Sequence, residues 1–249
     1  MLQAVIDSLF DRHTELRAVL EAVLEGRVGR VESEGDPPRV ARLTVGCYHF
    51  FGGDPSLPEA RRFVDTAAAP RELVYGKDPA WRRLILDVYG PCVSDRPMQT
   101  FDPSRLSTPA LQRMEGALPE GFELRRFDAA LATQLDRELE PHALQVYTSA
   151  AAFAESGIGY GAIKEGRLAC AATSYTVSSR GVEIAIATRP EFRGLGLAAA
   201  ASARLMRHCL ESGLVPHWSA SNPVSQRLAA RLGYGPGGVC EILYLVSED

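Results

Sequence analysis

Residues 187–206 read ATRPEFRGLGLAAAASARLM, with two glycines one residue apart just before an alanine-rich run. Glycine has no Cβ, so a ligand can approach its backbone closely. The first N–H groups of a helix are unpaired and favour negative charge, which makes a helix N-terminus a site for phosphate. The stretch therefore predicts a phosphate-binding turn between a strand that ends near Thr188 and a helix that runs to about Leu210.

Three classes of phosphate ligand compete for this turn. A Walker-type loop ends in Gly-Lys-Ser/Thr, which the turn lacks. A dinucleotide-binding turn needs Gly-x-Gly-x-x-Gly within a β-α-β unit. Gly194 and Gly196 fit that spacing, but position 199 is Ala. The third class is the diphosphate of a coenzyme A derivative, bound after a run of antiparallel strands.

The segments before the turn favour the third class. Three runs with strand character follow one another at 158–166, 167–177 and 181–188. The linkers 164–166 and 178–180 are too short to hold crossover helices, so we expect antiparallel hairpins. The turn is followed by a strand at 214–221, a helix from Pro223 to Leu232 and a last strand at 240–246.

The N-terminal half has a different pattern, and no internal repeat is visible. Residues 2–24 have the apolar spacing of a helix, 40–50 alternate as a strand, and Asp78 with Pro79 begins another helix. A Pro/Gly turn near 118–121 marks a boundary. We therefore expect an N-terminal α/β domain over 1–118 and a second domain over 119–249.

Two blocks resemble one known family. Arg193-x-x-Gly196-x-Ala198, led by Pro190, looks like the acyl-CoA diphosphate motif of the GCN5-related N-acetyltransferases, the GNAT superfamily. A second block matches the later strand–helix unit of that family through Asn222, Ser225, Leu228, Leu232, Gly233 and Tyr234.

The resemblance covers about residues 120–249, and the whole chain looks like a two-part subgroup of the superfamily. It implies an α/β (α+β) GNAT fold, in which helices flank a mixed, mostly antiparallel sheet. A smaller α/β N-terminal domain would precede this fold.

The resemblance also implies a donor site for acetyl-CoA. Backbone N–H groups of the turn would bind the diphosphate, from residues Arg193, Gly194, Leu195, Gly196, Leu197 and Ala198. The strand residues Ile186, Ala187 and Thr188 would pair with the pantetheine amides like an added strand. Asn222 and Ser225 would lie near the pantetheine, although Asn before Pro is also typical of a helix N-cap.

Glu183 is the candidate general base. It shares a strand face with Ala185 and Ala187, and an apolar setting raises the pKa of a carboxyl group. Family members often carry a glutamate on this strand for that task. Many also carry a tyrosine just after the leucine that is Leu228 here, but this chain has Ala229. Proton donation by that tyrosine therefore does not carry over, and solvent can protonate the released thiolate.

The expected activity is transfer of an acetyl group from acetyl-CoA to an amine, directly within a ternary complex. The acceptor would be a small molecule or a peptide, and the N-terminal domain would help to shape its site. The alternative is a non-catalytic acyl-CoA-binding or regulatory module.

Composition limits the other possibilities. The formal net charge of −4 argues against a general nucleic-acid binder. The five cysteines are scattered, which indicates no metal site. The sequence contains no apolar run of about 18 residues, so we expect no membrane span. We expect a cytoplasmic protein, as a monomer or homodimer, that uses no metal.

Overall fold

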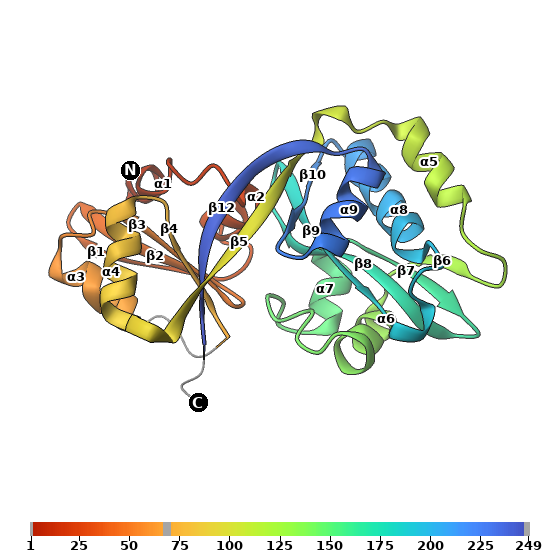
Figure 1. Ribbon diagram of the computed structural model, residues 1–249, viewed down its shortest axis with the longest axis horizontal. Helices are drawn as coiled ribbons and strands as arrows, with labels where there is room; N and C mark the ends of the chain where they lie inside the picture. Colours follow the sequence, from red (N-terminus) through yellow and green to blue (C-terminus); the bar gives the residue numbers. More distant parts are fainter. Residues whose placement is uncertain (1, 67–70, 247–249) are drawn as a thin grey trace. The chain divides into compact units, whose positions relative to one another are not determined.

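The computed structural model describes residues 2–66 and 71–246 (Figure 1). Contacts divide the chain into two compact units. Unit 1 comprises Met1–Met98 with Val239–Asp249, and unit 2 comprises Gln99–Gly238. The boundary expected at 118/119 falls inside unit 2, because helix α5 (Thr108–Gly116) packs on α8 (Leu197–Glu211) in that unit. The division into domains 1–118 and 119–249 therefore stays a prediction about which parts fold independently.

Unit 1 is built on a mixed sheet. Its strands β1, β2 and β3 are joined as antiparallel hairpins, and β4 lies parallel to β3. The bounds of its elements are α1 (Leu2–Leu9), α2 (Arg17–Leu24), β1 (Arg30–Gly35), β2 (Pro38–Val45), β3 (Tyr48–Gly53), α3 (Pro58–Asp65), β4 (Leu73–Gly76) and α4 (Pro79–Tyr89).

Two expectations for this half are wrong in detail. The single helix over 2–24 is two helices, because Leu16 adopts a left-handed conformation with φ 53°. The single strand over 40–50 is a hairpin that turns at Gly46, where φ is 54°. The helix expected after Asp78 is confirmed, and the Asp78 carboxylate accepts a hydrogen bond from the Ala80 N–H at 2.8 Å.

Unit 2 contains a five-stranded sheet in the order β10-β9-β8-β7-β6. The expected antiparallel run β7–β8–β9 is confirmed, and only β10 is parallel to its neighbour, β9. Besides α5 and α8, its elements are β6 (Glu123–Arg126), α6 (Ala129–Gln134), a π-helical turn (Leu135–Leu139), α7 (Ala150–Ser156), β7 (Gly159–Lys164), β8 (Arg167–Val177), β9 (Gly181–Thr188), β10 (Val215–His217), β11 (Ser219–Ala220) and α9 (Pro223–Leu232).

Side chains alternate between the two faces of this sheet, and each face packs against a separate hydrophobic core. The core with α5, α8 and α9 contains Leu111, Leu205 and Leu232, and Ile184 of β9 belongs to it. The other core, with α6 and α7, includes Phe153 and is flanked by Ala187 of β9. Odd-numbered residues of β9 from 183 to 187 therefore face the α6–α7 layer, as expected for a strand period of two.

Two long strands have residues in both units. These are β5 (Val93–Asp102) and β12 (Gly235–Leu245), which belong to a seven-stranded sheet in the order β1-β2-β3-β4-β12-β5-β11. In unit 1, Leu243 of β12 pairs with Val74 of β4, and in unit 2, Thr100 of β5 pairs with Ser219 of β11. The strand expected at 214–221 is therefore interrupted after His217, and its two parts join different sheets.

The order of elements in unit 1 recurs in unit 2. Each has two helices, three antiparallel strands, a helix, a strand parallel to the third, and another helix (Figure 1). The next strand is then used differently, because β12 follows α9 but pairs with β4, while β5 follows α4 but pairs with β11. The order of these elements is thus repeated, although unit 2 also contains α5, β6 and β11 and the sequence shows no repeat. No helix in the described ranges is long and apolar enough to span a membrane.

Candidate functional site

The glycine turn lies where the sequence predicts it, between β9 and α8. Gly194 and Gly196 have φ values of 80° and 83°, a left-handed region that L-residues with side chains rarely adopt. Apart from the two flanking residues, no heavy atom lies within 4 Å of the place that a Cβ would take at either glycine. Gly196 is the N-cap of α8 and carries no side chain to cap the first N–H groups. The backbone here is both open and unshielded.

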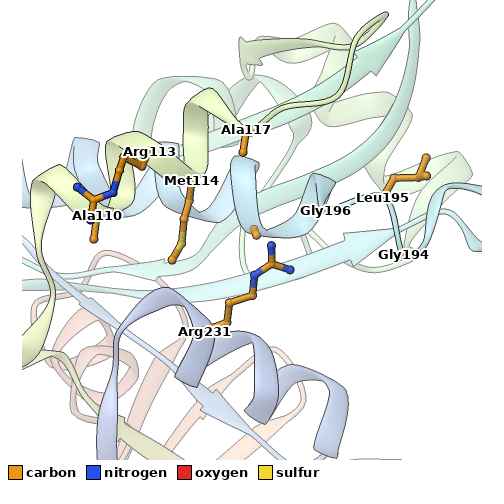
Figure 2. Close-up of a pocket in the computed structure, with 9 residues that line it drawn as sticks. Ala110, Arg113, Met114, Ala117, Gly194, Leu195, Gly196 and Arg231 are labelled. Atoms are coloured by element: carbon orange, nitrogen blue, oxygen red, sulfur yellow. The ribbon is translucent and has the colours of Figure 1, made fainter.

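A pocket of about 360 Å³ opens beside this turn. Three helices of unit 2 surround it, with Arg231 reaching from α9 toward the first turn of α8 and α5 on the opposite side (Figure 2). The residues that line it are Ala110, Arg113, Met114, Ala117, Gly194, Leu195, Gly196, Ala199 and Arg231. The pocket thus combines an open helix N-terminus, two arginines and an apolar wall.

The strand that leads to the turn has an open edge. β9 pairs with β10 only over 181–183, whereas its pairing with β8 continues to Thr188. The Arg189 N–H donates to the Ala169 carbonyl at 3.0 Å. Because outward and inward groups alternate in an antiparallel pair, the N–H and C=O groups of Ile186 and Thr188 point away from β8. The Thr188 carbonyl accordingly accepts a hydrogen bond from Arg193 Nε at 3.3 Å.

The N-terminus of α9 is capped as the sequence predicts. Asn222 Oδ1 accepts a hydrogen bond from the Ser225 N–H at 2.9 Å. The Ser225 hydroxyl accepts one from Trp218 Nε1 at 3.1 Å. Both residues therefore have hydrogen-bond partners at the start of α9.

Glu183 is buried, with 6% of its surface exposed. Its Oε1 accepts a hydrogen bond from the Ser219 hydroxyl at 2.6 Å. Burial penalises the carboxylate and raises the pKa of Glu183 to about 7, while the hydrogen bonds from Ser219 act in the opposite direction. The group can therefore exchange a proton near neutral pH.

Tyr234 lies in the core on the α8–α9 side of the sheet. Its hydroxyl donates to the Pro216 carbonyl at 2.9 Å. Burial, and then the charge of Glu183, raise the pKa of this phenol well above 10.0. It packs as the aromatic residue of the Leu-Gly-aromatic end, and Ala229 is buried in the same core.

A second pocket, of about 190 Å³, lies over β8 and β9 on the α6–α7 side. Its floor includes Ala185 and Ala187, which share the strand face of Glu183. The loop between α6 and α7 contributes polar side chains. The lining residues are Leu135, Glu140, Pro141, His142, Ala143, Gln145, Ala171, Thr173, Tyr175, Ala185, Ile186 and Ala187.

In unit 1, the end of strand β3, which corresponds to the open end of β9, is covered. β3 and β4 stay paired from Tyr48 to Phe51, and the Trp81 ring stacks on Phe51 with centroids 5.3 Å apart. Trp81 Nε1 also donates to the Gly53 carbonyl at 3.1 Å. The turn that follows contains Asp54, a carboxylate that would repel phosphate. Of the two arrangements, that of unit 2 combines an open strand edge with a glycine turn that carries Arg193.

The structure thus brings together several predicted residues and adds three that the sequence analysis missed. The glycine turn and the strand 186–188 are consecutive, and Glu183 lies on the same strand. Ser219 was missed because a break after β10 places it on β11. Arg113 was missed because it precedes the expected domain boundary. Arg231 lies within the 222–234 block, so its position near the donor site could have been predicted from the sequence.

Comparison with known proteins identifies the family and the fold. A family model described as GNAT acetyltransferase matches residues 7–238. A curated relative, the uncharacterized N-acetyltransferase YdfB of Bacillus subtilis (strain 168), is 31% identical over 119 residues. That match covers 47% of this chain and 46% of the relative, so the chain spans about half the length of the curated relative it matches.

Two solved structures share the fold. A GCN5-related N-acetyltransferase-like protein from Streptococcus suis 89/1591 superposes with a TM-score of 0.86 at 26% identity, covering 98% of both chains. A GCN5-related N-acetyltransferase from Kribbella flavida has a TM-score of 0.61 at 16% identity, covering 95% of both, which shows the fold alone. The fold is α+β with two mixed sheets and helices, and the chain belongs to the GNAT acetyltransferase family, whose members are acyltransferases that use an acyl-CoA co-substrate.

Proposed function

We propose that this protein transfers an acetyl group from acetyl-CoA to an amine, directly and within a ternary complex. The observation that carries this proposal is the continuous run of open features in unit 2. The unpaired edge of β9 leads into a left-handed glycine turn, and the turn opens into the pocket beside α8. These features fit an extended ligand that ends in a diphosphate.

In this proposal the outward N–H and C=O groups of β9 pair with the pantetheine amides, over Ile186, Ala187 and Thr188. The turn Arg193–Ala198 binds the diphosphate through its backbone N–H groups. Asn222 and Ser225 hold the start of α9 beside the pantetheine. Holding both substrates in place supplies much of the rate enhancement, because positioning removes the entropic cost of bringing them together.

Glu183 acts as the general base, through water or the Ser219 hydroxyl. The amine nitrogen forms a bond to the thioester carbonyl carbon, the carbon–sulfur bond breaks, and the electron pair leaves with the CoA sulfur. Glu183 receives the proton lost by nitrogen, and solvent returns a proton to the thiolate. A pKa near 7 suits a base that must accept a proton at neutral pH.

The acceptor amine would enter through the pocket over β8 and β9. That pocket has an apolar floor formed by Ala171, Ala185 and Ala187, and a polar rim that includes Glu140. A carboxylate at the rim attracts an ammonium group, and the alanine floor accommodates a short apolar portion. We further propose that residues 1–118 influence the choice of acceptor, since Trp81 covers the counterpart of the donor strand in the described part of unit 1.

Gly196→Glu tests the donor site. Its side chain would place bulk and negative charge in open space where a phosphate must approach, so we expect the affinity for acetyl-CoA to fall by at least about 100-fold. Gly196→Ala is the matched control, because it imposes the same left-handed strain without the charge and should bind far better. Calorimetry on the folded variants measures both affinities.

Unchanged affinity in folded Gly196→Glu would refute the donor site. The transfer activity needs its own assay, in which thiol release from acetyl-CoA is followed with a panel of amines. Binding of acetyl-CoA without release with any amine would favour the non-catalytic alternative.

A further inference from the structure

We propose that Arg113 and Arg231 bind the 3′-phosphate of the acyl-CoA, which makes helix α5 a wall of the donor site. This inference rests on the proposed function and extends it to residues outside the glycine turn. Arg113 lies on α5 and Arg231 on α9, and both line the pocket beside Gly194 and Gly196 (Figure 2).

Coenzyme A carries two separate anionic groups. The N–H groups of one helix N-terminus can serve the diphosphate, but they are then no longer available to the phosphate monoester on the ribose. A phosphate monoester carries about −1.5 to −2 charges at pH 7 and offers three acceptor oxygens. It therefore needs additional donors next to the turn, and guanidinium groups have the geometry to hold it.

The pocket carries an excess of positive charge, which favours the binding of a phosphate. Nearby on α8, Arg204 and Arg207 form ion pairs with Glu115 at 3.4 and 3.0 Å. Within the described part of the chain, neither Arg113 nor Arg231 forms an ion pair. Both are exposed, so they carry free positive charge on a protein whose formal net charge is −4.

The rest of the pocket fits the nucleoside portion of the same ligand. Ala110 and Met114 of α5, with Ala117 at its C-cap, form an apolar side of the same pocket. An adenine ring can pack against such a wall while its phosphate contacts the cations. The 360 Å³ volume lies in the usual range for small-molecule sites.

The test compares acetyl-CoA with 3′-dephospho-acetyl-CoA, by calorimetry on the full-length protein at low salt. We expect the wild type to prefer acetyl-CoA by about 10- to 100-fold, the range for hydrogen bonds between charged groups. Arg113→Gln/Arg231→Gln should lose this preference while keeping its affinity for the dephospho form. Arg231→Lys should retain part of it.

Arg61→Gln/Arg83→Gln is the matched control, since it removes two exposed arginines from α3 and α4 in unit 1 and changes the net charge equally. It should leave the preference intact. Added salt should reduce the wild-type preference, because the phosphate contacts are near the surface.

Other outcomes separate the two proposals. If the wild type binds both forms equally, or if the double variant loses equal affinity for both, the arginines do not hold the 3′-phosphate, and the proposed function still stands. If the folded wild type binds neither form, the proposed function itself fails, and this inference fails with it.

Discussion

Glu183 owes its properties to two opposing influences on one carboxyl group. Burial disfavours the charged form, and the Ser219 hydroxyl at 2.6 Å favours it. The balance leaves a pKa of about 7, against 4.5 for an exposed glutamate. A buried acid whose pKa is adjusted by a hydrogen-bond partner is typical of a proton-transfer group.

Glu183→Gln should lower kcat by about 10²- to 10⁴-fold, the usual contribution of a positioned base. It should leave acetyl-CoA affinity nearly unchanged and remove the fall in rate that we expect of the wild type below pH 7. Ser219→Ala is a second variant that tests the same assignment. It removes hydrogen bonds that lower the Glu183 pKa, so the fall in rate should move to higher pH. The measurement is a pH–rate profile with a known acceptor.

Stability provides a control for that variant. A native pKa near 7, above the unfolded value of 4.5, means that the native state binds the proton more tightly. Stability from this group is full below pH 4.5 and is lost as pH rises through 7, by about 3 kcal/mol from 1.36 kcal/mol per pKa unit. Glu183→Gln lacks this loss, so its stability relative to wild type should increase with pH. An unchanged rate together with this stability pattern would show that Glu183 is structural.

The separation of β9 from β10 is the feature of secondary structure on which donor binding depends. The two strands pair for three residues, and the next five residues of β9 have only β8 as a neighbour. In unit 1, Trp81 covers the end of the equivalent strand. The same succession of elements therefore leaves an open edge in one unit and a covered edge in the other.

Ile186→Pro tests whether this edge binds the pantetheine. The Ile186 N–H points away from β8, so proline removes an outward donor while the ladder to β8 is retained. We expect acetyl-CoA affinity to fall about 2- to 10-fold, as for the loss of one hydrogen bond. Ile186→Val keeps the N–H and should bind like the wild type in the same titration. Equal binding by the proline variant would place the pantetheine elsewhere.

The composition of the two units has consequences for how the chain can be divided. α5 covers α8 in unit 2, and its Leu111 is fully buried. The expected boundary at 118/119 would separate these two helices. The last strand contributes Ile242 and Leu243 to the buried residues of unit 1. A cut at 118 therefore uncovers one core and leaves a strand without its β4 partner.

Two fragments test this division. Residues 99–238 should fold and bind acetyl-CoA, because they retain α5 and the pairing of β5 with β11. Residues 119–249 should aggregate or lose affinity, because the α8 surface under Leu111 and the apolar strand 239–245 are both exposed. Circular dichroism, gel filtration and calorimetry on each fragment decide the matter. A folded 119–249 that binds as well as 99–238 would support the boundary at 118/119.

The sequence alone determined the local features of this protein. Positive φ at the glycines, the Asn222 cap and the short hairpin linkers depend on nearby residues, so the turn, α9 and the β7–β9 run could all be predicted. The matching of two motifs then indicated the family.

Only the tertiary structure decided what depends on partners distant in the chain. The pairing of β12 with β4, and of β5 with β11, cannot be inferred from strand periodicity. The periodicity is the same whichever neighbour a strand pairs with. The hydrogen bond from Ser219 to Glu183, and the presence of Arg113 and Gly196 in one pocket, follow from packing across 36 and more than 80 residues. Such long-range contacts set the pKa of the candidate base and the charge of the candidate donor pocket, because burial and proximity exist only once the chain has folded.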